Sequence, residues 1–144
     1  MKYLPHIFVT VDVVLSRKFD GEQQILLIQR KNEPFKDYWA LPGGFVDKEE
    51  DIEVAAKREL FEETDIQLFQ VKQVGAYGKP DRDPRHHTLS VAYYGEIDAL
   101  AIAKAKDDAK SVKWFSIEEL PALAFDHSEI IRDTIDRYIK KPSY

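Results

Sequence analysis

The segment from residue 44 to residue 66, GFVDKEEDIEVAAKRELFEETDI, constrains this chain more than any other part of its sequence. On an α-helix, Glu59, Glu62 and Glu63 stand at positions i, i+3 and i+4, so their carboxylates project from one face. Like charges this close repel each other, so clustering them does not stabilise a fold. Carboxylate oxygens hold hard divalent cations such as Mg²⁺, commonly beside a phosphate substrate. The segment therefore predicts a metal-binding helix that serves phosphate chemistry.

A helix rich in Glu, Lys and Arg is also typical of a solvated surface, and two features favour the functional interpretation. Residues 41–44, LPGG, predict a rigid turn directly before the helix. Ile52, Ala55, Ala56 and Leu60 form an apolar stripe opposite the carboxylates, as expected for a helix that packs on a core.

The segment resembles the Nudix box, whose pattern is Gly, five residues, Glu, seven residues, then Arg-Glu-aliphatic-any-Glu-Glu-any-Gly-aliphatic. The matching positions are Gly44, Glu50, Arg58, Glu59, Leu60, Glu62, Glu63 and Ile66. One position departs, because Asp65 stands where the box has its late Gly. That Gly normally follows the helix in a left-handed conformation, which Asp adopts at modest cost. The departure leaves every carboxylate in place.

The resemblance implies an α/β fold, namely the Nudix-type α/β/α sandwich with a mixed β-sheet. It also implies hydrolysis of a nucleoside diphosphate linked to another moiety, with Mg²⁺ as the expected cofactor and Mn²⁺ as the alternative. We expect Glu50 and Arg58 to form an ion pair that holds the loop against the helix and affects metal affinity only indirectly. The candidate catalytic residues are Glu50, Arg58, Glu59, Glu62 and Glu63, and the candidate metal ligands are Glu59, Glu62, Glu63 and the carbonyl of Gly43.

A second stretch narrows the substrate. Residues 78–94, GKPDRDPRHHTLSVAYY, resemble the part of small ADP-ribose pyrophosphatases in which Arg-Asp-Pro-Arg precedes a strand, and AFDH at 124–127 before a final helix is similar to the same group. The resemblance indicates hydrolysis of ADP-ribose to AMP and ribose 5-phosphate. The alternatives are a broader nucleotide-sugar or oxidised-nucleotide hydrolase and a non-catalytic ADP-ribose-sensing module. A charged hairpin loop with no role in binding would also explain residues 79–85.

Guanidinium groups make bidentate contacts with diphosphates and carboxylates, so Arg30 and Arg85 are candidates for binding the substrate phosphates, with Arg82 behind them. The general base is open. Asp107 and Asp108 lie where related enzymes often bring an acidic residue, although a loop of Lys and Asp is usually just solvated.

Aromatic residues precede the metal helix. Phe35, Tyr38 and Trp39 are candidates for stacking on adenine, and Trp39 fits a core position equally well. His127 has no metal-ligand spacing with the other histidines, so we expect it to contact the start of a helix.

The remaining sequence predicts strands over 6–16, 23–30, 69–78, 88–97 and 112–115, with a turn near Asp20. Residues 99–110 fit either a loop or a short helix. Ser116 is a predicted N-cap for a short helix over 117–120, and Asp126 for a final helix to about Lys140.

Composition limits the remaining possibilities. A chain of 144 residues suits a single domain over 1–144, and we expect no appended winged-helix or nucleotidyltransferase domain. The absence of cysteine is compatible with a reducing cytoplasm, and the N-terminus alternates like a strand instead of resembling a signal peptide. No apolar run approaches about 20 residues, so no membrane partner is expected. The net charge of −5 disfavours nucleic acid as a partner, and the resemblance suggests a possible homodimer.

Overall fold

The structure is a computed structural model that describes residues 6–105 and 109–139. Asp107, Asp108 and Lys140 lie outside the described residues. Among those described, a mixed sheet forms from β1 (Phe8–Phe19), β2 (Glu22–Arg30), β3 (Trp39–Ala40), β4 (Gly43–Phe45), β5 (Lys72–Tyr77), β6 (Thr88–Glu96) and β7 (Ala109–Ser116). The strand order is β3-β2-β1-β6-β5, while β4 pairs with β1 and β7 pairs with β2. The pairing of β1 with β6 is parallel, and the other strand pairings are antiparallel.

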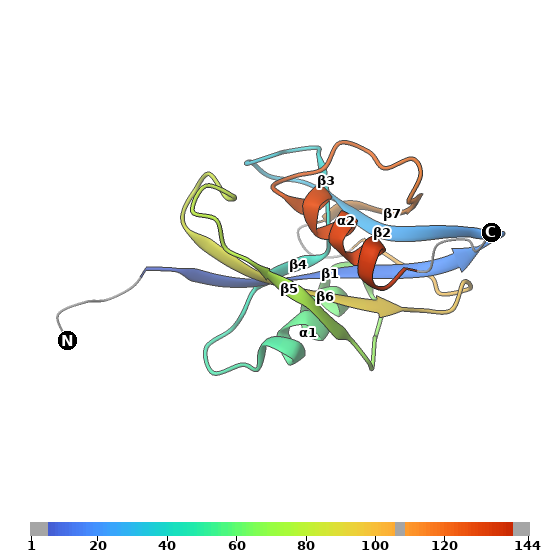
Figure 1. The fold of residues 1–144 in the computed structure, drawn as a ribbon, viewed down its shortest axis with the longest axis horizontal. Coiled ribbons are helices and arrows are strands. Elements are labelled where there is room, and N and C mark those ends of the chain that lie inside the picture. Colours follow the sequence, from blue (N-terminus) through green and yellow to red (C-terminus); the bar gives the residue numbers. More distant parts are fainter. Residues whose placement is uncertain (1–5, 106–108, 140–144) are drawn as a thin grey trace.

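Two helices cover the sheet, α1 (Ile52–Thr64) on one face and α2 (His127–Arg137) on the other, as Figure 1 shows. Alternation along β1 explains both layers, because successive side chains of a strand point to opposite faces. Val11, Val13 and Leu15 pack toward α1, whereas Val14 packs with Ile130 of α2. The predicted α/β class with a mixed sheet between helices is confirmed.

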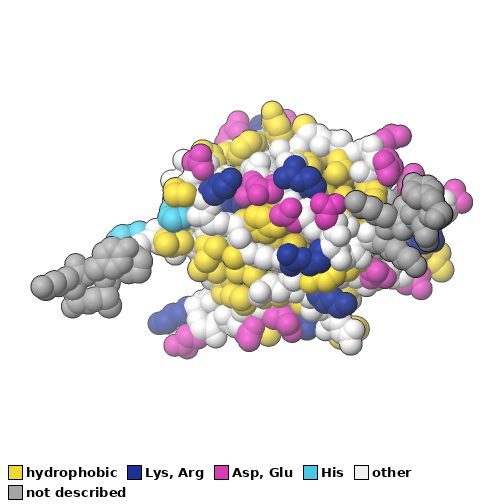
Figure 2. All heavy atoms as spheres, viewed as in Figure 1, with side chains coloured by type: hydrophobic (Ala, Val, Ile, Leu, Met, Phe, Trp, Pro, Cys, Tyr) yellow, Lys and Arg dark blue, Asp and Glu magenta, His cyan; other side chains and the backbone are white. Residues whose placement is uncertain are grey.

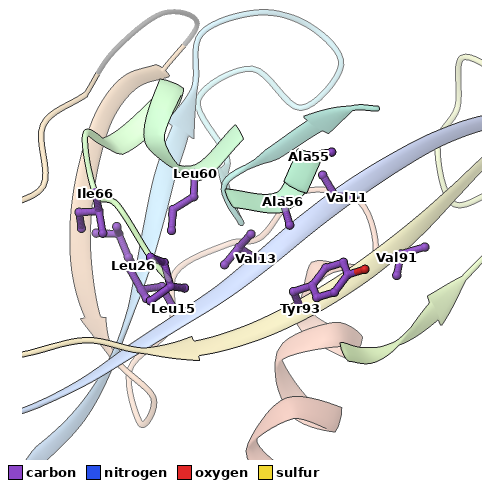
Figure 3. Packing of buried hydrophobic residues seen from close by; sticks show 11 residues of the cluster. Val11, Val13, Leu15, Leu26, Ala55, Ala56, Leu60, Ile66, Val91 and Tyr93 are labelled. Carbon is purple, nitrogen blue, oxygen red and sulfur yellow. The ribbon is translucent and has the colours of Figure 1, made fainter. Parts of the chain in front are cut away.

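The core beneath α1 contains the predicted apolar stripe. Ala55, Ala56 and Leu60 are fully buried, and Figure 3 shows them beside the β1 side chains Val11 and Val13. On the other face, Figure 2 shows basic and acidic side chains interspersed over α2. The box carboxylates lie beside this apolar face of α1, and Glu63 is itself buried against β4.

The end of α1 follows the prediction made for Asp65. This residue is the C-cap and adopts the left-handed conformation, with φ 64° and ψ 16°, and its N–H donates to the carbonyl of Phe61 at 2.9 Å. Asp therefore does at this position what the box glycine does elsewhere, and the helix ends where the box requires.

Other element predictions need correction. Residues 117–120 form a turn and not a helix: the Ser116 hydroxyl accepts from the Glu118 N–H at 3.2 Å, and the Glu119 N–H donates to the Ser116 carbonyl at 3.0 Å. Pro121 disfavours helical backbone at residue 120, and four residues are too few to compensate. Gly43 and its neighbour Gly44, predicted in a turn, begin strand β4.

The N-cap of the final helix, α2, is at the predicted residue, Asp126, but that residue makes no side-chain capping hydrogen bond. Its carboxylate instead accepts from the guanidinium of Arg82 at 2.9 and 2.6 Å. Sequence patterns of helix starts cannot anticipate such competition from a distant arginine.

Candidate active site

A cleft of about 670 Å³ lies where α1, the sheet edge and the chain entering α2 meet. Its walls come from β1, β2, β4, α1 and residues 82–88 and 125–127. The predicted site residues that line it are Arg30, Gly43, Arg58, Glu59, Glu62, Glu63, Arg82 and Arg85. Tertiary structure thus brings together residues that are up to 55 positions apart.

Helix α1 supplies one wall with three carboxylates that differ in exposure. The side chains of Glu59 and Glu62 are 14% and 44% exposed, and Glu63 is buried. The N–H of Gly43 donates to Glu63 Oε1 at 2.7 Å, which joins the helix to the first residue of β4. The helix start is fixed by Asp51, whose carboxylate accepts from the Glu53 N–H at 2.8 Å.

Arg58 is the cation at the centre of this wall. It donates to Glu50 through Nε (2.7 Å) and Nη2 (2.9 Å), and its Nη2 also reaches the Phe45 carbonyl at 3.1 Å. Its Nη1 lies 2.9 Å from Glu59 and 3.1 Å from Glu62. The expected ion pair between Glu50 and Arg58 is therefore present, although Glu50 does not line the cleft among the described residues.

The charge states of this group follow from these contacts. Hydrogen bonds from Arg58 and from the Asp47 N–H lower the pKa of Glu50 to about 2. The same bond to Glu50 raises the pKa of Arg58 above its ordinary value. Burial raises the pKa of Glu59, and the bond from Arg58 opposes that shift without cancelling it. Glu59 is thus a carboxylate that a further cation would stabilise in its charged form.

The two glycines before the helix are required by close approach. A Cβ at Gly44 would lie 2.5 Å from a carboxylate oxygen of Glu59. A Cβ at Gly43 would lie 2.1 Å from the carbonyl oxygen of Val11. A larger residue at Gly43 would push β4 away from β1, whereas one at Gly44 would displace the Glu59 carboxylate from its place on the cleft wall.

The donor set suits a hard divalent cation, because three carboxylates and a backbone segment share one wall. In the side-chain positions of this structure, no three acidic or histidine side chains of residues 6–105 and 109–139 converge on a common point suited to a metal ion. Glu59 and Glu62 converge instead on Nη1 of Arg58. The chemistry of these carboxylates fits a metal ion. Rotation of the Glu59 and Glu62 side chains away from Arg58 would make their oxygens available as ligands.

The opposite wall carries two predicted phosphate-binding residues. Arg30, the last residue of β2, donates through Nε to the Pro34 carbonyl at 2.7 Å. Arg85 forms a bidentate pair with the buried Asp83 at 3.1 and 2.8 Å, and its side chain remains 43% exposed. The ring of Phe125 lies beside both guanidiniums. Arginines held this way present fixed donors to the cleft.

Arg82 also lines the cleft, with a side chain that is almost fully buried. Its side chain is 5% exposed and paired with Asp126, and that pair joins residues 79–87 to the start of α2. The contact therefore makes Arg82 a support of the wall.

The three candidate aromatic residues separate in the structure. Trp39 packs edge-on against Phe115, with ring centroids 4.8 Å apart, and belongs to the core beneath α2. Phe35 lines a second hollow of about 400 Å³ that adjoins the cleft at Arg82 and Phe125. Tyr38 is exposed and contacts the ring of Phe35. Of the three, only Phe35 lines either hollow.

A buried polar group at the floor of the cleft was missed by sequence reasoning. Asp12 of β1 accepts from the Ser90 hydroxyl at 2.5 Å, and its other oxygen lies 3.5 Å from Nε2 of His127. The Leu41 N–H donates to Nδ1 of His127 at 3.0 Å. The ring of this first α2 residue therefore contacts the segment between β3 and β4 and not the helix start, and it lines the cleft. Burial lowers the pKa of His127, which keeps the imidazole neutral. The only available signal was a carboxylate inside the apolar run VTVDVVL.

The fold and this cleft define a class of protein, an α/β/α sandwich with an acidic helix facing a pair of arginines. Residues 7–137 match the family model described as NUDIX domain, and the chain belongs to the Nudix family. Residues 44–66 are its Nudix box, and the expectation of a Nudix pyrophosphohydrolase is confirmed at the level of the family.

Three relatives are informative. The chain is 45% identical over 129 residues to "ADP-ribose pyrophosphatase" of Methanocaldococcus jannaschii, a match covering 89% of this chain and 73% of that one. It is 38% identical to "ADPR responsive transcriptional repressor NtrR" of Acinetobacter baylyi, covering 97% of this chain but 58% of the repressor. The solved NUDIX domain of Shewanella oneidensis NrtR, complexed with ADP ribose, aligns with a TM-score of 0.88 at 31% identity and covers 93% of this chain and 90% of that domain.

Helices able to cross a membrane are absent from the part of the chain that the structure describes.

Proposed function

We propose that this protein is a Mg²⁺-dependent ADP-ribose pyrophosphatase that forms AMP and ribose 5-phosphate. The observation that carries the proposal is the cleft with the box carboxylates on one wall and Arg30 and Arg85 on the other. Two of the relatives described above carry ADP-ribose in their names or titles in ways that agree: one as the substrate of a pyrophosphatase, one as a bound ligand.

Charge supports the requirement for a metal ion. Among the described residues that line the cleft, seven are Asp or Glu and five are Lys or Arg. Three of those five, Arg58, Arg82 and Arg85, are already paired with carboxylates. A diphosphate would be repelled by this excess of carboxylates unless divalent cations offset the negative charge. Glu59, Glu62 and Glu63 would hold Mg²⁺, or Mn²⁺ in its place, with the carbonyl of Gly43 as a further ligand.

When bound, the metal polarises a phosphoryl oxygen, offsets charge on the diphosphate and lowers the pKa of a bound water. The residues of the chain bind the substrate and orient its diphosphate. Arg30 and Arg85 would hold the diphosphate through charge-assisted hydrogen bonds. Arg58, anchored by Glu50, would pair with Glu59 and Glu62 until those carboxylates turn toward the metal. One P–O bond of the anhydride breaks, water adds to that phosphorus, and the bridging oxygen leaves with the other phosphate.

The second hollow is the proposed binding site of the adenine of ADP-ribose. Phe35 and Phe125 line it together with Lys79 and Pro84, and it adjoins the cleft. Adenine would stack against Phe35 there, as aromatic rings do with purines. This retains Phe35 from the sequence prediction, while Trp39 contributes to the core.

A substrate panel tests the proposal: ADP-ribose, ADP-glucose, diadenosine polyphosphates, NADH and 8-oxo-dGTP, each with Mg²⁺. We expect ADP-ribose to give the highest kcat/KM, with AMP and ribose 5-phosphate as products. A higher kcat/KM for any other member would replace ADP-ribose as the substrate, as the alternative of a broader nucleotide-sugar or oxidised-nucleotide hydrolase requires.

A second candidate function is a non-catalytic ADP-ribose-sensing module, favoured by the relative named as an ADPR responsive repressor. The complete set of box carboxylates favours the enzyme. Tight binding of ADP-ribose without turnover in Mg²⁺ or Mn²⁺ would establish the sensor.

We further propose that the protein acts in the cytoplasm on a small-molecule nucleotide without a nucleic-acid partner, in keeping with a net charge of −5 and no cysteine. A homodimer is the proposed assembly, and light scattering after size-exclusion chromatography tests it. Gel-shift experiments with duplex DNA test the exclusion of nucleic acid.

A further inference from the structure

Phe125 lies between the two arginines of the cleft wall. Its ring centroid is 4.9 Å from Cζ of Arg30 and 5.9 Å from Cζ of Arg85. Both distances are within the range of attraction between a cation and an aromatic ring. The three residues come from β2, from the segment before β6 and from the residue before the α2 N-cap. One ring therefore joins two cations that the sequence keeps 55 positions apart.

The backbone at Phe125 adopts a conformation that its residue type disfavours. Its φ is 51°, in the left-handed region, which non-glycine residues with bulky side chains rarely occupy. Flanking bonds hold it there: the Trp39 N–H donates to the Ala122 carbonyl (3.1 Å), and the Ala124 N–H donates to the Trp39 carbonyl (2.8 Å). The residue that follows Phe125, Asp126, forms an ion pair with Arg82. Such conformations persist where surrounding structure imposes them, commonly at ligand sites.

Each arginine also has an oxygen that orients one edge of its guanidinium. For Arg30 this is the carbonyl of Pro34, and for Arg85 it is the carboxylate of Asp83. The ring of Phe125 adds contact to the plane of each cation. A guanidinium restrained in this way before the ligand arrives loses less conformational freedom on binding.

We propose that Phe125 is a positioning residue that holds Arg30 and Arg85 as one unit for the substrate diphosphate. The inference rests on the proposed function, because it assigns these arginines to that group. Phe125 itself contacts the arginines, while the phosphates contact the guanidiniums. The competing explanation is packing alone, since the ring also lies 4.9 Å from that of Phe35 and beside the small cluster around Ile28.

Coupling between Phe125 and Arg85 separates the two explanations. The variants are Phe125→Leu, Phe125→Tyr, Arg85→Ala and the double variant Phe125→Leu/Arg85→Ala. The measurements are kcat and KM for ADP-ribose with Mg²⁺, and the affinity for ADP with Mg²⁺ by calorimetry. Phe115→Leu is the matched control: it removes a half-buried ring that also faces a cation, Lys113 at 5.2 Å, but does not line the cleft.

We expect Phe125→Leu to raise KM about 10-fold while kcat stays within about twofold, consistent with the strength of such contacts. Phe125→Tyr keeps the ring and should restore KM to within about threefold of wild type. The double variant should raise KM over that of Arg85→Ala by clearly less than the roughly 10-fold effect of Phe125→Leu alone, because the ring can then act only through Arg30. The control should leave KM unchanged.

Two results would overturn the inference. The first is a KM of the double variant in which the effects of Phe125→Leu and Arg85→Ala multiply. The second is a rise in KM for Phe125→Leu that is no larger than the rise for Phe115→Leu. If Phe125→Leu does not fold, Phe125→Met is used under the same criteria. The ADP arm keeps this inference distinct from the proposed function. Absence of ADP-ribose hydrolysis by the wild type overturns the function, whereas unchanged ADP affinity in Phe125→Leu overturns the positioning role even if hydrolysis is intact.

Discussion

The carboxylates of α1 show how single residues in one motif differ in their surroundings. Glu63 is buried and accepts from the Gly43 N–H, Glu59 is held close to the backbone of Gly44, and Glu62 is 44% exposed. Arg58 is the cation that Glu59 and Glu62 share. A change at Glu62 therefore perturbs the fold least while altering the proposed metal site.

We expect Glu62→Gln to lower kcat about 100-fold or more while the free energy of unfolding stays within about 0.5 kcal/mol of wild type. Loss of a metal ligand removes several kcal/mol of transition-state stabilisation, and an exposed isosteric change is nearly neutral for folding. Kinetics at saturating Mg²⁺ and urea unfolding measure the two effects. Glu53→Gln is the control, because Glu53 is exposed on the same helix and pairs with Lys57. Near wild-type activity of Glu62→Gln would remove it from the ligand set.

Asp65 tests the end of the helix by its backbone. With φ at 64°, Asp65→Gly should be neutral or stabilise by up to about 1 kcal/mol, whereas Asp65→Val should destabilise by about 1–2 kcal/mol. Thermal unfolding of both variants measures the difference. Equal stability of Gly and Val at this position would show that the left-handed conformation is not required.

Between elements, the pair of Arg82 and Asp126 is the main polar link from residues 79–87 to α2. Both side chains are largely buried, at 5% and 19% exposure, and the bond is bidentate. Without it, the start of α2 would lose this charged link to the segment that carries Arg85. The pair therefore joins the segment that forms one cleft wall to the start of α2.

We expect Arg82→Met to lower the free energy of unfolding by about 3 kcal/mol, because removal of one partner leaves a carboxylate with no compensating charge in a mostly buried position. The double variant Arg82→Met/Asp126→Asn should recover at least half of that loss. Urea unfolding of the single and double variants provides the measurement. Additive losses would show that each residue stabilises the protein independently.

Across the whole molecule, the acidic helix and the arginine wall face each other over one cleft, so metal and nucleotide should bind cooperatively. We expect Mg²⁺ to increase the affinity for ADP at least 10-fold, within the usual range of coupling between sites. ADP should increase the affinity for Mg²⁺ by the same factor. Calorimetry in EDTA and in Mg²⁺ measures both, with adenosine as the uncharged control. Coupling with adenosine as strong as with ADP would mean that the diphosphate does not face the metal.

Local spacing predicted the box helix, and the resemblance to the Nudix box added its left-handed end at Asp65, the pairing of Glu50 with Arg58 and the α/β class. Contacts between distant segments could not be predicted this way. The sequence could not show that Arg82 takes Asp126 away from its capping role or that Trp39 packs with the core beneath α2. The turn over 117–120 was readable from Pro121, which the helix prediction overlooked.

The sequence by itself determined which chemistry the chain carries, because the carboxylates, glycines and Arg58 of the box lie within 23 residues and their geometry follows from one helix and the turn before it. Only the tertiary structure decided where the partners of that chemistry stand. Asp12, Arg30, Arg85 and Phe125 come from separate segments, and their proximity depends on the parallel pairing of β1 with β6 and on the bridge of β3 to residue 123. Such pairings join residues far apart in the chain, and no local pattern encodes them.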